Sequence, residues 1–102
     1  MRTIFFALMF SIFSYGQDIT VVHFNYKWNG SNKFKGLERL RSAKVQYAFV
    51  EDQSDAIIRS IKSVPTIIIY KDGRPVGKFE AGLQMQILVA IEEIQDEIDK
   101  HK

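Results

Sequence analysis

The run Thr66–Tyr70 (TIIIY) is the segment that most restricts how this chain can fold. Its β-branched and aromatic residues predict a buried strand. Val64-Pro65 stands before the run and sets its start, because the residue that precedes a proline avoids helical dihedral angles. Asp72-Gly73 follows and predicts a tight hairpin turn into a partner strand over Val76–Glu80. Pro75 places that partner at an edge of the sheet, since proline donates no ladder hydrogen bond.

Two further strands are predicted nearer the N-terminus. Ile19–Tyr26 is rich in β-branched and aromatic residues, and Lys44–Val50 alternates before it becomes apolar. Because a helical segment joins them, these two strands must be parallel with a right-handed crossover, whereas the hairpin strands are antiparallel. The sequence therefore predicts an α/β fold in which a mixed four-stranded sheet carries helices on both faces.

Three helices are expected around these strands. The first has its N-cap at Ser31, has apolar residues three apart and ends near Arg41 to Ala43. The second is capped by Ser54 and ends at Val64-Pro65. The third begins at about Gln84 and is amphipathic. Its apolar stripe consists of Ile87, Leu88, Ile91, Ile94 and Ile98.

The first sixteen residues differ from the rest. Met1-Arg2 is followed by the apolar run Ile4–Phe13, and Ser14 and Gly16 occupy the −3 and −1 places of a cleavage site. This layout predicts a signal peptide over residues 1–16, a domain over 17–102 and export to the periplasm or the extracellular space. The run is shorter than the about 20 residues that span a bilayer, so no stable membrane span is expected. The alternative is a cytoplasmic protein in which these residues form a buried first element.

Charge and composition exclude several functions. The formal charge of +2 comes from 14 basic and 12 acidic residues that are dispersed along the chain, so a nucleic acid partner is not expected. The chain has no cysteine, which excludes disulfides and every mechanism that needs a thiolate. The two histidines lie in different parts of the predicted fold, His23 in a strand and His101 near the C-terminus, so a metal site is not predicted. No cofactor is expected.

The segment after the first strand resembles a catalytic loop. Its sequence, WNGSNK, is similar to the Trp-Cys-Gly-Pro-Cys-Lys loop of the thioredoxin family. Asn29 and Asn32 stand where that family has its nucleophilic and resolving cysteines, and a carboxamide cannot attack a disulfide sulfur. The resemblance therefore implies a redox-inactive member. This degenerate loop consists of Trp28, Asn29, Gly30, Ser31, Asn32 and Lys33.

Two more patterns support the resemblance, which covers about Ile19 to Ile98. Ser63–Thr66 is similar to the family's cis-proline loop, and the hairpin with Gly82 after it is similar to the family's hairpin and groove glycine. The resemblance implies a thioredoxin-like fold with a shortened first helix and without the family's own first strand and helix. His23 takes the place of a buried acid that assists proton transfer, and either a core role or a proton-transfer role is open to it.

The resemblance also implies a function. In the family, the backbone before the cis-proline pairs with an extended substrate peptide, and such strand addition needs no thiol. We therefore expect non-covalent binding of a protein or extended peptide, although Trp28 and Pro65 are equally consistent with purely structural roles. The alternatives are a structural subunit that docks through the hairpin edge, a thiol-independent enzyme, or an engineered cysteine-free form. The expected groove consists of Trp28, Val64, Pro65, Thr66 and Gly82.

Overall fold

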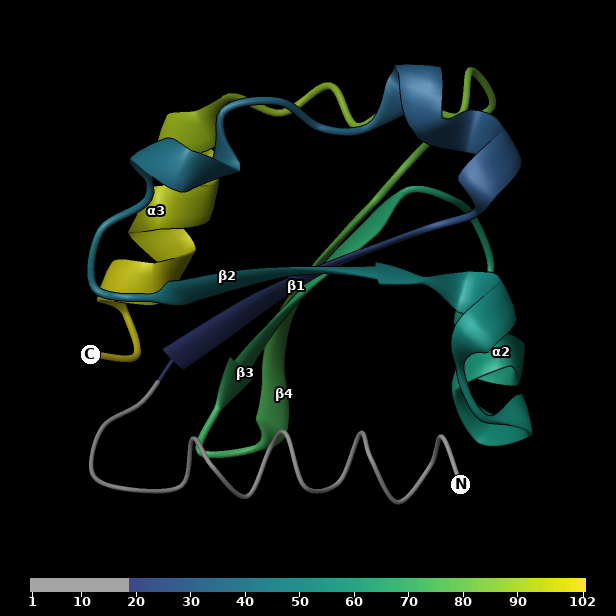
Figure 1. Ribbon diagram of the computed structural model, residues 1–102. Coiled ribbons are helices and arrows are strands. Elements are labelled where there is room, and N and C mark those ends of the chain that lie inside the picture. The colour runs from purple at the N-terminus through teal and green to yellow at the C-terminus, as the bar shows by residue number, and fades with distance from the viewer. Residues whose placement is uncertain (1–18) are drawn as a thin grey trace.

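The computed structural model describes residues 19–102 and contains one mixed sheet (Figure 1). Its strands are β1 (Ile19–Asn25), β2 (Lys44–Phe49), β3 (Thr66–Lys71) and β4 (Arg74–Glu80). Their order across the four-stranded sheet is β2-β1-β3-β4, with β1 and β2 parallel and the other pairs antiparallel. The predicted sheet is confirmed. The predicted signal peptide, residues 1–16, lies outside the described residues.

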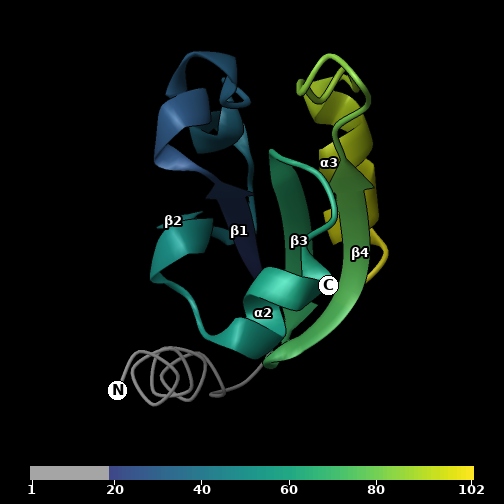
Figure 2. The ribbon, with the colours of Figure 1, turned by 90° about the vertical axis from the view of Figure 1, so that its right-hand side faces the viewer.

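Successive strand residues point to opposite faces of the sheet, and an apolar layer covers each face. On one face, Val21 and Ile67 pack with Ile94 of α3 (Ile91–Asp99). On the other face, Val22 and Phe24 belong to a cluster against which α2 (Asp55–Ser60) packs its isoleucines. Figures 1 and 2 show these helices on opposite sides of the strands. Helices on both faces were predicted, and the period-2 alternation of the strands is the reason.

The hairpin follows its sequence signal closely. Asp72 and Gly73 both have positive φ angles, 52° and 86°, as a two-residue turn of the favoured hand requires. The β4 strand lies at an edge of the sheet, as Pro75 predicted, and begins one residue before that proline.

The predicted first helix is wrong. Between β1 and β2 the chain forms only two 3-10 segments, η1 (Lys27–Asn32) and η2 (Leu37–Arg39). Lys33 is extended, with ψ at 147°, and Gly36 is left-handed, with φ at 97°, so no continuous helix can run through them. The Phe34 N–H donates to His23 Nε2 at 3.0 Å instead of to a helical carbonyl. Ser31 consequently lies inside η1 and caps nothing.

The other helices are shorter than predicted. Ser54 does cap α2, since its Oγ accepts from the Ile57 N–H at 3.5 Å, but the helix ends at Ser60. Between it and β2 lies a third 3-10 segment, η3 (Val50–Asp52). The last helix, α3, begins only at Ile91, and Ala90 before it is extended, with ψ at 151°. Leu88, predicted on the buried stripe, lies before the helix and is 74% exposed. Between Ile19 and Lys102 no helix has the length and apolarity needed to cross a membrane.

Candidate binding site

Asn29, at the first cysteine position, is a buried structural residue. Its side chain is only 2% exposed. Its Nδ2 donates to Asn25 Oδ1 at 3.1 Å and reaches the carbonyl oxygens of Met85 and Val64 at 3.4 and 3.5 Å. In return, Asn25 Nδ2 donates to the Asn29 carbonyl oxygen at 3.0 Å. One carboxamide thus joins the loop to the segments on either side of it.

Asn32, at the second cysteine position, extends this network. Its Nδ2 donates to Asn29 Oδ1 at 2.8 Å, and its Oδ1 accepts from Gln86 Nε2 at 2.9 Å. The network satisfies the buried side chains of Asn25 and Asn29, which would be costly if unpaired, and extends outward through half-buried Asn32 to exposed Gln86. Both cysteine positions therefore hold hydrogen-bonding side chains that shape the loop, and neither presents a nucleophile.

Trp28 borders an open pocket beside this loop. Its side chain is 64% exposed and stacks on Tyr26, with ring centroids 5.7 Å apart and planes 13° apart. The pocket has a volume of about 350 Å³. We call it the Trp28 pocket; it is lined by Tyr26, Trp28, Ile61, Lys62, Ser63, Val64, Gly82, Leu83 and Met85.

The structure brings together three of the five predicted groove residues. Trp28, Val64 and Gly82 line the Trp28 pocket. Pro65 and Thr66 are fully buried and lie outside its lining. The Thr66 hydroxyl donates to the Ser63 carbonyl at 2.6 Å and so closes the loop before β3. The Val64–Pro65 peptide bond is cis.

The remaining loop residues face elsewhere. Ser31, Asn32 and Lys33 line a separate, smaller hollow with Gln86 and Ile87. Lys33 Nζ lies 5.7 Å from the centre of the Tyr47 ring, toward β2. Gly30 is exposed, and a Cβ atom built on it would meet nothing within 4 Å, so no close approach requires glycine there. The degenerate loop is thus divided between two surfaces.

His23 lies under the chain that follows the loop. It is 2% exposed, and its Nε2 accepts the Phe34 N–H at 3.0 Å, which requires that nitrogen to be unprotonated. Burial, with a smaller contribution from the charge of Lys33, lowers the pKa of His23 from 6.5 to about 4. The imidazole is therefore neutral at pH 7 and serves as a fixed hydrogen-bond acceptor.

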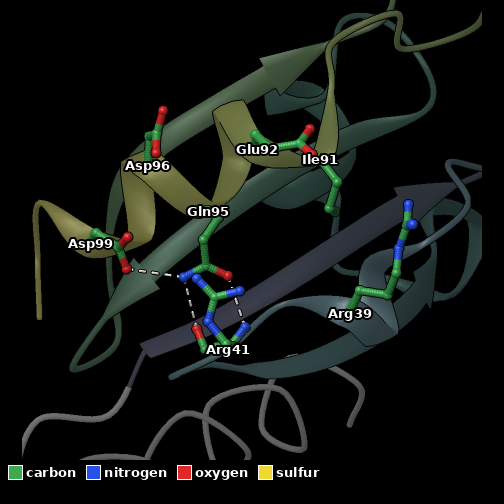
Figure 3. Close-up of a pocket in the computed structure, with 7 residues that line it drawn as sticks. All are labelled: Arg39, Arg41, Ile91, Glu92, Gln95, Asp96 and Asp99. Carbon is green, nitrogen blue, oxygen red and sulfur yellow. Dashed lines mark hydrogen bonds between the residues drawn. The ribbon is translucent and has the colours of Figure 1, made fainter.

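A second hollow, of about 310 Å³, lies between η2 and α3 (Figure 3). Its central polar group is Gln95, whose Oε1 accepts from the Arg41 N–H at 2.8 Å and whose Nε2 donates to the Arg41 carbonyl at 3.1 Å. Gln95 Nε2 also donates to Asp99 Oδ1 at 3.0 Å. Because these bonds occupy its carboxamide, Gln95 ties the chain before β2 to α3 and offers little to a ligand.

Metal binding has no support in the geometry. Within residues 19–102, no group of three or more histidine, cysteine, aspartate or glutamate side chains could hold an ion. His101 instead contacts Glu97 Oε2 at 3.3 Å on α3.

Comparison with known proteins identifies the fold. No protein-family model matches the chain, and no curated protein matches it in sequence. A thioredoxin from Fasciola hepatica is 20% identical, with a TM-score of 0.66, and the match covers 99% of this chain and 96% of that one. A mutant thioredoxin from Halobacterium salinarum gives a TM-score of 0.65 at 17% identity, over 89% and 80% of the two chains. A thioredoxin from Nicotiana alata gives 0.63 at 18% identity, over 95% and 84%.

These likenesses show that the chain has the thioredoxin fold. At this level of identity they show the fold alone. Since the chain contains no cysteine, it is a thioredoxin-like protein without redox cysteines, and disulfide exchange is excluded on chemical grounds.

Sequence reasoning missed part of the site. Leu83 and Met85 line the Trp28 pocket, yet Met85 fell within the predicted last helix and Leu83 just before it. The amide network was also missed. No local pattern predicts it, because Asn25 ends strand β1 and Asn29 has non-helical dihedral angles, so the spacing rules of a helix do not apply to these residues.

Proposed function

We propose that this protein binds an extended, apolar polypeptide segment non-covalently in the Trp28 pocket. The observation that carries the proposal is the exposure of large apolar side chains around one concave site. Leu83 is 101% exposed, Trp28 64% and Met85 43%. Exposed apolar side chains that gather at a hollow are typical of binding surfaces, whereas scattered ones need no explanation.

The size and charge of the pocket favour such a ligand. A volume of about 350 Å³ is at the small end of the range for ligand pockets and suits one or two side chains. Of the described residues that line it, only Lys62 carries a charge. Its stacked Tyr26 and Trp28 rings form a rigid wall that loses little conformational entropy on binding. An apolar side chain with a neutral or acidic neighbour therefore fits this site best.

The main chain offers a second contact. None of residues 19–102 accepts a hydrogen bond from the Val64 N–H, and the Val64 carbonyl has only a long contact, 3.5 Å, with Asn29 Nδ2. An extended segment could pair with this residue as in strand addition, while its side chain enters the pocket.

Trp28 supplies the test, because it is the only tryptophan in the chain. We would titrate the protein with the carboxymethylated B chain of insulin, an unfolded polypeptide that contains no tryptophan, and follow Trp28 emission. Leu83→Ser is expected to weaken binding about tenfold, since it removes most of the apolar leucine surface that a bound peptide would cover. Leu88→Ser is the matched control, because Leu88 is 74% exposed but lies outside the pocket lining. Unchanged emission at saturating probe, or equal effects of the two variants, would overturn the proposal.

We also propose that the protein is exported after cleavage between Gly16 and Gln17. The charged start, the apolar run and the small residues at the cleavage site support this. Sequencing the N-terminus of the protein from its native cell tests it. A chain that begins at Gln17 is the expected result, and a chain that retains Met1 would refute export.

A further inference from the structure

The two edges of the described sheet are built differently. The β4 edge carries several features that discourage pairing with another strand. It contains Pro75, and the register with β3 shifts between Ile69 and Tyr70, which leaves Val76 as the extra residue of a bulge. Lys78 and Glu80 form an ion pair of 3.3 Å on the same strand. This edge is therefore protected.

Among residues 19–102, the β2 edge carries fewer such features, the exposed Lys44 at its start being one. Its register with β1 runs without a break through six residue pairs, and its sequence contains no proline. Tyr47 and Phe49 are 54% and 48% exposed on it. A regular edge strand with exposed aromatic side chains is a ready template for another strand.

The side chains of β2 are self-complementary. Val45, Tyr47 and Phe49 alternate onto the same face of the sheet, since successive side chains of a strand point to opposite faces. If two β2 strands pair antiparallel about a twofold axis at Tyr47, each Tyr47 lies opposite the partner's Tyr47. Each Val45 then lies opposite the partner's Phe49. Aromatic pairs and aromatic pairs with β-branched residues are the stabilising cross-strand combinations.

The register centred on Tyr47 is the only twofold register that pairs Val45, Tyr47 and Phe49 among themselves. A register centred on Ala48 would place Tyr47 opposite the partner's Phe49, but it would place Val45 opposite the charged Glu51, which lies after the strand ends. A register centred on Gln46 would place Phe49 opposite the partner's Ala43, which lies before the strand begins. The register centred on Tyr47 keeps every apolar pair within Lys44–Phe49. The side chains of Lys27 and Lys33 lie over the Phe49 and Tyr47 rings, at 5.4 and 5.7 Å, so their aliphatic stems would flank the apolar cluster.

We infer that β2 pairs antiparallel with β2 of a second copy of this chain, with Tyr47 on the twofold axis. The resulting eight-stranded sheet would continue across the dimer. A contact confined to one short strand buries less than the about 1,600 Å² of a standard interface, so the dimer is expected to be weak and concentration-dependent. The inference does not depend on the Trp28 pocket.

The absence of natural cysteine permits a test that reads the register directly. Opposite residues of antiparallel strands have Cα atoms about 4.5 to 5.5 Å apart, within the range that a disulfide bridges. In the full chain, Tyr47→Cys is therefore expected to form an intermolecular disulfide under mild oxidation. Phe49→Cys alone is not, because two Phe49 positions would be about 13 Å apart along the strands.

Three arms complete the experiment. A mixture of Val45→Cys and Phe49→Cys chains is expected to cross-link, whereas each alone is not. Trp28→Cys, at a residue that is 64% exposed, measures random collision. The Tyr47→Cys rate should exceed this background on the order of tenfold, through its effective concentration. Equal rates for Tyr47→Cys, Phe49→Cys and Trp28→Cys, or cross-linking of Phe49→Cys alone above the rest, would overturn the inference.

The association of the wild-type protein provides a second, independent test of the dimer. Sedimentation equilibrium should show a dimer that grows with concentration, and Tyr47→Lys should shift it toward monomer by placing two like charges opposite each other. Circular dichroism checks that the variant folds. Trp28→Ala should leave the dimer unchanged, so a failure of peptide binding and a failure of dimerisation are separable. A wild-type monomer at every concentration, or a dimer that Tyr47→Lys leaves intact, would refute pairing at β2.

Discussion

The two crossover connections of the sheet hold their shape by different means. The connection from β1 to β2, residues 26–43, buries Leu37 and Leu40 and is also held by hydrogen bonds to the side chains of Asn29, His23 and Gln95. The connection from β2 to β3, residues 50–65, is held by the isoleucines of α2 on an apolar layer. The difference shows that a crossover can do without an α-helix if buried polar groups take over its hydrogen bonds. Such a connection should be sensitive to charge and pH, and the apolar one should not.

The largest expected effect comes from a charge placed in the amide network. Asn29→Asp puts an acid at a site that is 2% exposed and faces the oxygens of Asn25, Met85 and Val64. We expect the free energy of unfolding to fall by about 3–4 kcal/mol at pH 7, measured by urea denaturation. Asn32→Asp is the matched control at a half-buried site, and its effect should be less than half as large. Equal losses would contradict a network centred on Asn29.

The next effect concerns pH. Because the folded-state pKa of His23 lies near 4 and its ordinary value is 6.5, the unfolded chain binds the proton first as pH falls. The contribution of His23 to stability is complete well above pH 6.5 and is expected to drop by about 3 kcal/mol between pH 7 and pH 4, with little further loss from this group below pH 4. Denaturation at several pH values measures it.

The control for His23 is His23→Gln, which keeps an acceptor but cannot take up the proton. Its stability should vary much less between pH 6.5 and pH 4. An identical pH dependence in wild type and variant would assign the effect to other groups.

The smallest effect belongs to the second connection. Ser54→Ala removes the N-cap of α2, and the long cap bond of 3.5 Å places the expected loss at about 0.5–1 kcal/mol. The loss should be the same at pH 7 and pH 5, in contrast to that of the first connection. Ser60→Ala, near the end of the same helix, serves as the control and should change stability by less. A pH-dependent loss in Ser54→Ala would weaken the contrast between the connections.

The strands were predictable because their signals are local. The run Thr66–Tyr70 is entirely strand, and Asp72-Gly73 forms the turn that its residues favour. The first helix was predicted from apolar spacing, because Phe34, Leu37 and Leu40 recur every three residues. Leu37 and Leu40 are indeed buried, but only Leu37 of the three lies in a 3-10 segment, and Leu40 is extended with ψ at 144°. The spacing therefore predicted which residues are buried, but it predicted the wrong backbone conformation.

The candidate site divides in the same way. Trp28, Val64 and Gly82 were found because they stand beside recognisable local patterns, and all three line one pocket. Leu83 and Met85 were missed because their positions depend on the left-handed backbone at Met85. A left-handed conformation is predictable at glycine or asparagine but not at methionine. His23 was placed in the core by its strand, but its bond to the Phe34 N–H is a tertiary contact with no local signal.

The burial of Asn29 also governs when this chain can be modified. Asn29-Gly30-Ser31 has the spacing of an N-glycosylation acceptor. The nitrogen that would carry the sugar is Nδ2, which the folded protein directs at three oxygens in its interior. A glycan could therefore be attached only before the loop closes, and a chain that carried one could not close it. In a cell that glycosylates its exported proteins, sugar at this position would mark the molecules that folded too late.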